Sequence, residues 1–75
     1  MKRIARQKAA VLDMLRRGPM TARDAAVRLD CLRLAARIYD LRAEGHEIAS
    51  EMAEGPDGAR FARYWLVRER TEEAA

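Results

Sequence analysis

Two arginines, Arg33 and Arg37, stand four residues apart in a segment with the apolar spacing of a helix. Four residues make about one helical turn, so the two guanidinium groups are expected on the same face. A guanidinium can donate two hydrogen bonds in one plane to O6 and N7 of guanine in the DNA major groove. We therefore predict that Arg33 and Arg37 contact DNA, with Ala36 on the same exposed face. The alternative is an intrahelical ion pair of Arg37 with Asp40.

A helix, a turn and a second helix over residues 21–45 are expected to position these arginines. Thr21 and Asp24 form a near capping box, which predicts a helix over residues 22–29. Asp30 then makes the turn and is expected to cap the third helix, which Gly45 ends. The buried stripe of the third helix is predicted to be Cys31, Leu34, Ile38 and Leu41. Two helices joined by a short turn can place one of them in the major groove.

Another helix is predicted before this unit and two strands after it. Apolar residues recur at helical spacing over residues 3–17 (Ile4, Val11, Leu12 and Leu15), and Gly18-Pro19 ends that helix. Period-two patterns predict strands over residues 46–52 and 60–67, joined by a turn over residues 54–58. A short extended piece at residues 19–20 is placed where it can pair with this hairpin. The polar residues 68–75 are expected to be frayed.

The predicted fold is therefore α+β, a winged helix-turn-helix with three helices followed by a two-stranded β-hairpin wing. It forms one domain over residues 1–67. In such an arrangement the second helix starts at the DNA backbone, so Thr21 and Arg23 are predicted to contact phosphate. Arg6, in a basic N-terminal segment, and Arg60, near the tip of the wing, are further candidates. The alternative for these arginines is simple solvation of exposed faces.

The second strand of the hairpin places aromatic residues on both of its faces. Tyr64 and Leu66 share one face, and Trp65 and Val67 share the other. Only one face can cover the core, so either Trp65 or Tyr64 is left partly exposed. We expect that residue to contact a second copy of the chain or another protein.

The net charge of +3 is unevenly distributed along the 75 residues. Residues 1–43 contain eleven Lys and Arg against four Asp and Glu, a charge of +7. Residues 44–75 contain four Arg against eight Asp and Glu, a charge of −4. This predicts a basic end that faces a polyanion and an acidic end that points away.

Catalysis, metal binding and cofactors find little support in the sequence. Ser50 has no suitable base nearby, His46 is isolated, and the single Cys31 excludes an internal disulfide. No apolar run approaches the ~20 residues of a membrane-spanning helix, and the N-terminus lacks the apolar core of a signal peptide. We expect a non-enzymatic domain without metal or cofactor, in the cytoplasm and not in a membrane.

The run CLRLAARIYDLRAEGHEI, followed by a Gly-rich turn and ARYWL, resembles a family of short winged-helix domains found largely in phages and prophages. The resemblance covers about residues 6–67. It implies the fold of DNA-binding transcriptional regulators and a cytoplasmic location in a bacterial host. The wing departs from a basic wing because Glu51, Glu54 and Asp57 lie on it.

Two functions remain open from the sequence. The first is a small regulator that binds double-stranded DNA through its third helix, as a homodimer or on tandem sites. The second is a protein-interaction module on the same fold, for example a phage-encoded inhibitor of a host enzyme. In the second case Trp65 and the acidic half matter more than Arg33 and Arg37.

Overall fold

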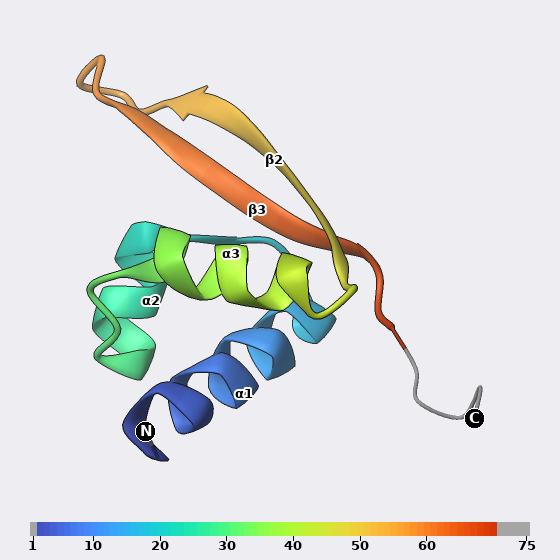
Figure 1. Cartoon of the computed structure of the whole chain (residues 1–75). Helices are drawn as coiled ribbons and strands as arrows, with labels where there is room; N and C mark the ends of the chain where they lie inside the picture. The colour runs from blue at the N-terminus through green and yellow to red at the C-terminus, as the bar shows by residue number, and fades with distance from the viewer. Residues whose placement is uncertain (1, 71–75) are drawn as a thin grey trace.

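The computed structural model describes residues 2–70, with side chains from Ile4 to Arg70. This part of the chain folds into α1 (Lys2–Arg17), β1 (Met20–Thr21), α2 (Ala22–Leu29), α3 (Leu34–Ala43), β2 (Glu47–Glu54) and β3 (Arg60–Arg68). Figure 1 shows the helices on one side of the sheet, with the β2–β3 hairpin arching over α3 and its closed end above α2. The order of elements agrees with the predicted winged helix-turn-helix. No helix in the described residues is long and apolar enough to cross a membrane.

The sheet has one strand more than the predicted two-stranded wing. The short β1 pairs antiparallel with β3, Met20 opposite Tyr64 and Thr21 opposite Arg63, which gives the order β1-β3-β2. The cap of α2 explains this third strand. Thr21 has the extended dihedrals of an N-cap, φ −117° and ψ 171°, so the same backbone both caps α2 and pairs with β3. The extended piece expected at residues 19–20 lies one residue further on.

The core lies between the three helices and one face of the sheet. Its buried residues are Val11, Leu15, Met20, Ala25, Cys31, Leu34, Ile38, Leu41 and Ile48. The predicted stripe of the third helix is confirmed for Leu34, Ile38 and Leu41, and Cys31, which precedes α3, is buried with them; all four are at most 2% exposed. Ile4 is on the predicted face of α1 but is 45% exposed, because it lies about two turns before Val11, the first buried residue of α1, and so beyond the end of the core.

The third helix begins later than predicted. Asp30 takes a left-handed conformation, φ 53° and ψ 34°, and closes α2 instead of opening α3. The following N–H, of Cys31, donates to the carbonyl of Ala25 at 3.0 Å. Arg33 is the N-cap of α3, with φ −127° and ψ 58°, and its own side chain makes no capping hydrogen bond. The turn is therefore longer than one residue, and Arg33 lies before the helix, not on it.

The chain beyond the predicted domain end at residue 67 is held against the body as far as Arg70. Strand β3 continues to Arg68, Glu69 accepts from the guanidinium of Arg16 at 2.6 and 2.8 Å, and the Arg70 N–H donates to His46 Nδ1 at 3.0 Å. The predicted frayed tail therefore starts too early at residue 68. Residues 71–75 lie outside the described residues.

Candidate nucleic-acid interface

The start of α2 is a fully formed capping box. Thr21 Oγ1 accepts from the N–H of Asp24 at 3.2 Å, and the Asp24 carboxylate accepts from the N–H of Thr21 at 2.9 Å. Both residues are half-buried, whereas Arg23 is exposed beside them. The predicted capping role of Thr21 is confirmed. Arg23 and the first turn of α2 present a cation at the positive end of a helix dipole.

The two arginines expected on one exposed face have separate environments. Arg33 is exposed at the N-cap of α3 and makes no ion pair with a described residue. The side chain of Arg37 is only 13% exposed. Its Nε donates to Asp40 at 3.0 Å and its Nη1 donates to Gln7 of α1 at 3.3 Å. The alternative of an Arg37–Asp40 pair is thus present, and Arg37 links α3 to α1.

Most of the exposed residues of α3 are small or apolar. Tyr39 is 74% exposed, and Ala35 and Ala43 are exposed, as is Arg42 near the end of the helix. Leu32, just before the helix, is 82% exposed. The predicted exposed face of Arg33, Ala36 and Arg37 is therefore wrong, since its two helical members, Ala36 and Arg37, are half-buried. The buried stripe of α3 shows which side of the helix faces the core. It does not show which of the remaining sides is covered by α1. Tyr39 was missed for this reason, although its spacing from Ala35 is helical.

Part of the positive charge of residues 1–43 is neutralised within the molecule. Lys8 pairs with Glu44, Arg16 with Glu69, and Arg17 with Asp13. Two of these acids come from the half of the chain that was predicted to point away. The hydrogen bond from Arg16 lowers the pKa of the Glu69 carboxyl and, reciprocally, raises that of the guanidinium. The two halves therefore interleave, and the predicted division into a basic end and an acidic end is wrong.

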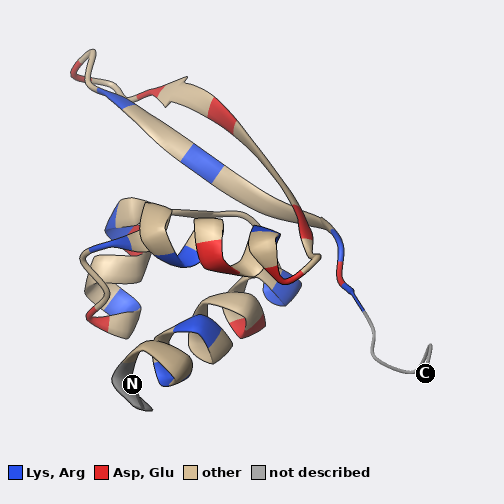
Figure 2. Ribbon diagram, viewed as in Figure 1, with Lys and Arg blue, Asp and Glu red and all other residues tan. Residues whose placement is uncertain are grey.

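Other arginines make neither an ion pair nor a side-chain hydrogen bond with the described residues. They are Arg6, Arg23, Arg28, Arg33 and Arg60. Figure 2 shows Lys and Arg on α2, at the start of α3 and near the closed end of the hairpin, all toward the same side of the molecule. Because these guanidinium groups have no carboxylate partner there, they remain available to an anion.

The tip of the wing carries charges of both signs. Arg60 is exposed at the start of β3, directly opposite Glu54 in the strand register, and Asp57 lies in the turn. A groove of about 680 Å³ separates this turn from the start of α2, and Arg23 lines it together with Glu54 and Asp57. Arg63, on the opposite face of β3, is paired with Glu51. The wing therefore offers Arg60 as a cation, but beside two acids.

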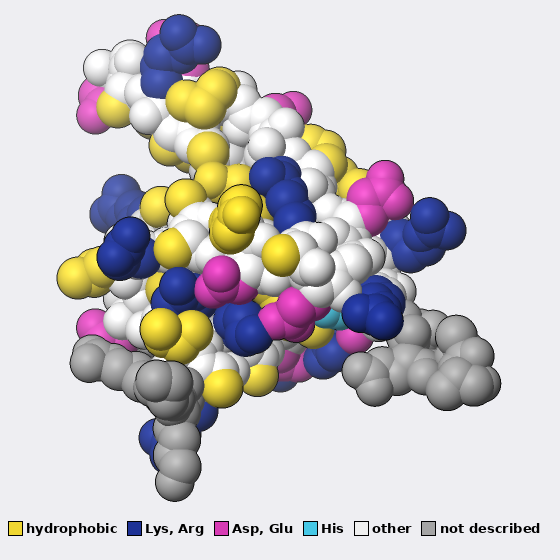
Figure 3. Space-filling view, in the orientation of Figure 1, with side chains coloured by type: hydrophobic (Ala, Val, Ile, Leu, Met, Phe, Trp, Pro, Cys, Tyr) yellow, Lys and Arg dark blue, Asp and Glu magenta, His cyan; other side chains and the backbone are white. Residues whose placement is uncertain are grey.

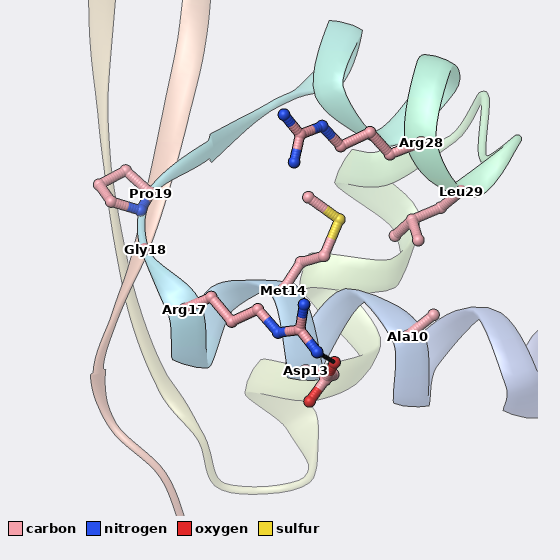
Figure 4. Close-up of a pocket in the computed structure, with 8 residues that line it drawn as sticks. All are labelled: Ala10, Asp13, Met14, Arg17, Gly18, Pro19, Arg28 and Leu29. Atoms are coloured by element: carbon pink, nitrogen blue, oxygen red, sulfur yellow. Dashed lines mark ion pairs between the residues drawn. The ribbon is translucent and has the colours of Figure 1, made fainter.

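Arg28 faces a different part of the surface. It lines a pocket of about 390 Å³ between α1 and α2, together with Met14, Leu29 and the Asp13–Arg17 ion pair, whose atoms are 3.2 Å apart. Figure 4 shows the Arg28 side chain extending from α2 across this pocket toward the segment that leaves α1. Arg28 thus lies on the α1 side of α2, away from Arg23.

The structure settles which face of the hairpin covers the core. Tyr64 and Leu66 pack against the buried cluster, together with Ile48 of β2. Trp65 lies on the opposite face, beside Ala49 in the register, and is half-buried. Tyr64 is therefore a core-covering residue. Trp65, with Phe61 at 39% and Val67 at 52% exposure, forms the outer face of the sheet.

Within residues 2–70 no group of three or more His, Cys, Asp and Glu side chains is placed to hold a metal ion. His46 is half-buried, and its Nδ1 accepts the hydrogen bond from Arg70. Cys31 is fully buried in the core, as predicted for a small apolar residue.

Comparison with known proteins agrees with this architecture. The family model described as a winged helix-turn-helix domain matches residues 6–69. No curated protein and no solved structure shows significant similarity to the chain. The family match spans most of α1, the whole turn between α2 and α3, and both strands of the wing. The chain therefore belongs to the winged helix-turn-helix domain family.

Proposed function

We propose that this domain binds double-stranded DNA, with α3 in the major groove and the start of α2 on the phosphate backbone. The observation that carries the proposal is the pair of exposed arginines, Arg23 and Arg33, which have no carboxylate partner in the described residues. Arg23 lies in the first turn of α2, and Arg33 lies directly before α3. Phosphate contacts are made at these two helix starts in this class of fold. Family membership supports the same reading.

The residues divide into distinct roles under this proposal. Arg23 and the N–H groups at the start of α2 bind one phosphate, with Thr21 holding that helix end in place. Arg33 reaches the groove edge at the start of α3. Ala36 lies on the half-buried side of α3, so the exposed Ala35 is the small residue that lets α3 approach the DNA closely. Arg37 positions α3 against α1 through Asp40 and Gln7. Arg6 and Arg60 attract phosphates electrostatically from a greater distance. The attraction by Arg60 is weaker because Glu54 lies opposite it.

The biological role that we propose is transcription regulation in the cytoplasm of a bacterial host, as a protein of phage or prophage origin. The resemblance of the run CLRLAARIYDLRAEGHEI to such domains supports this role. One α3 contacts only a few base pairs, so we propose that two copies act together, as a homodimer or on tandem sites.

Fluorescence anisotropy with a labelled random-sequence duplex tests DNA binding directly. The full chain is titrated at low and at near-physiological salt. We expect micromolar or tighter binding at low salt, with log K falling linearly against log salt concentration. In the Arg23→Gln, Arg33→Gln double variant the slope is expected to decrease by about two, since each lost phosphate contact removes about one.

Arg68→Gln is the matched control. Arg68 is also an exposed arginine, but it lies beside Glu47 at 3.8 Å at the opposite end of the hairpin from the wing tip. Removing its charge changes the net charge by the same amount per residue and leaves the proposed contacts intact. Absence of binding by the folded chain at low salt, or an equal loss of slope in the control, contradicts the proposal.

The second candidate function is a protein-interaction module, favoured by the outer face of the sheet. Phe61 and Val67 are exposed there on either side of Trp65, and no helix covers this face of the hairpin in Figure 1. We propose Trp65 and its two neighbours as the contact with a second copy or another protein. Analytical ultracentrifugation of the chain and of Val67→Glu measures this contact. A monomer at all concentrations excludes the second copy as its partner.

A further inference from the structure

Helix α3 has no arginine that is free to read a base. Arg37 uses Nε and Nη1 on Asp40 and Gln7. Arg42 donates from Nε at 3.1 Å and from Nη2 at 2.7 Å to the carbonyl oxygen of Ile48, which fixes the end of α3 to β2. Lysine, asparagine and glutamine are absent from α3. The bidentate recognition of guanine or adenine therefore has no side chain to perform it within α3.

What α3 exposes instead is mainly methyl and aromatic surface. Ala35, Tyr39 and Ala43 follow one another at helical spacing along the exposed side. Figure 3 looks onto α3 and shows hydrophobic side chains over it and over the hairpin above, with Lys and Arg and also Asp and Glu among and around them. Two alanines also allow the backbone of α3 to come close to an opposing surface.

The major groove of DNA contains one apolar recognition element, the C5 methyl group of thymine. Apolar side-chain groups contact it, among them the methyl groups of alanine and threonine and the ring of phenylalanine. We propose that α3 selects its site through thymine methyl groups, which Ala35 and Tyr39 bury, and that the arginines supply affinity without selecting the base. This inference rests on the proposed function and specifies the ligand of that same surface.

Among the described residues, the unpaired cations near this apolar surface favour DNA as its occupant, since the nearby acids Asp40 and Glu44 are paired with Arg37 and Lys8. Arg33 lies at the N-cap next to Leu32 and Ala35, and Arg23 lies at the start of the preceding helix, both without a carboxylate partner in the described residues. In a duplex, one row of phosphates runs along each side of the major groove, and the groove contains thymine methyl groups. The proposed surface therefore matches the duplex both in charge and in polarity.

Replacement of thymine by uracil tests the inference, because it removes the C5 methyl group and keeps every hydrogen-bonding atom. The probes are two duplexes of equal length, alternating d(A-T) and alternating d(A-U), titrated by anisotropy at the same salt concentration. We expect about fourfold weaker binding to d(A-U) for each methyl group that is buried, with an unchanged salt slope. Alternating d(G-C) with 5-methylcytosine is expected to bind more tightly than unmethylated d(G-C).

Tyr39→Ala assigns the effect to α3. The ratio of affinities for d(A-T) and d(A-U) is expected to fall toward one in this variant. Val27→Ala is the matched control, since Val27 is an equally exposed apolar residue, at 75%, on α2. It is expected to keep the ratio of the unmodified chain.

The failure of this inference differs from the failure of DNA binding. Equal binding of d(A-T) and d(A-U) overturns methyl recognition and leaves DNA binding in place. A ratio that Tyr39→Ala leaves unchanged overturns the assignment to α3. No binding to either duplex at low salt overturns the proposed function and this inference with it.

Discussion

Two ends of the molecule use arginine in opposite ways. At the turn end, which we define as α2, residues 30–33 and the start of α3, Arg23 and Arg33 are exposed without a carboxylate partner in the described residues. At the tail end, defined as the end of α1 with residues 44–47 and 68–70, arginines contact acids or carbonyls. Arg16 binds Glu69, and Arg70 donates to the carbonyl of Glu44 at 2.9 Å.

The difference shows why a count of charges along the chain misplaces the binding surface. The acids that neutralise Lys8 and Arg16 are 36 and 53 residues away in sequence, so no local pattern reveals them. Surface pairs of this kind contribute little to stability, but they remove a cation from the set that a polyanion can bind. The binding surface is located better by the number of guanidinium groups without a carboxylate partner at one end of the molecule.

Charge reversal at the two ends is expected to give the largest contrast. Arg23→Glu with Arg33→Glu removes two phosphate contacts and adds two repulsions, and roughly tenfold per lost contact at about 0.1 M salt predicts at least a hundredfold loss of DNA affinity. Arg17→Glu with Arg68→Glu makes the same change in net charge elsewhere. Anisotropy with one random duplex compares the two double variants. Equal losses would mean that net charge alone determines binding and that the two ends do not differ.

The turn at the tail end depends on a glycine. Gly45 has φ +106°, and a Cβ there would lie 2.7 Å from Cδ of Arg70. Gly45→Ala is expected to lower the free energy of unfolding by about 1–2 kcal/mol, mainly through the left-handed backbone, since the Arg70 side chain can move. Thermal unfolding measures the loss. DNA affinity at low temperature should remain unchanged, and a loss of affinity without a loss of stability would place this turn in the interface.

Arg37 distinguishes a base contact from a positioning role. Its side chain is 13% exposed and has partners on α1 and α3, so Arg37→Gln is expected to cost about 1 kcal/mol of stability, a fall of roughly 4–8 °C in Tm. Arg33→Gln, which breaks no described contact, should leave Tm unchanged and weaken DNA binding. The reverse pattern, with Arg37→Gln stable but defective in binding, would restore Arg37 as a DNA contact.

Much of the fold followed from local patterns. The capping box at Thr21 and Asp24, the stop at Gly18-Pro19 and the glycine at the end of α3 act within a few residues, and each element boundary near them agrees with the structure to within about a residue. The start of α3 did not follow, because Asp30 serves equally as an N-cap or as a left-handed residue at a helix end. Its chemistry suits both positions, and only the packing of α2 selects one.

The exposed face of α3 required information that one helix does not contain. Its buried stripe was correct, yet the side that α1 covers depends on a contact between Gln7 and Arg37, which are 30 residues apart. The same holds for the hairpin, where alternation separated Tyr64 from Trp65 without showing which face meets the core. The sequence pattern predicted which residues share a face of α3 or of the hairpin. Which element packs against each face is decided by tertiary packing.

The Arg16–Glu69 pair gives the smallest expected effect, a change in how stability depends on pH. Arg16 lowers the pKa of Glu69 in the folded state, so this carboxylate stabilises the fold above the ordinary glutamate value of 4.5. That contribution is lost as the pH falls through the lower folded-state pKa.

Glu69→Gln removes this contribution. The Tm of the variant is expected to lie below that of the unmodified chain at neutral pH, and the difference should shrink below pH 4.5. Glu47→Gln, which alters the wider Arg68 pair at 3.8 Å, is the control and should change the profile less. A constant deficit at every pH would mean that Glu69 acts through packing and not through its charge, and the tail end would then be held by shape instead of paired charges.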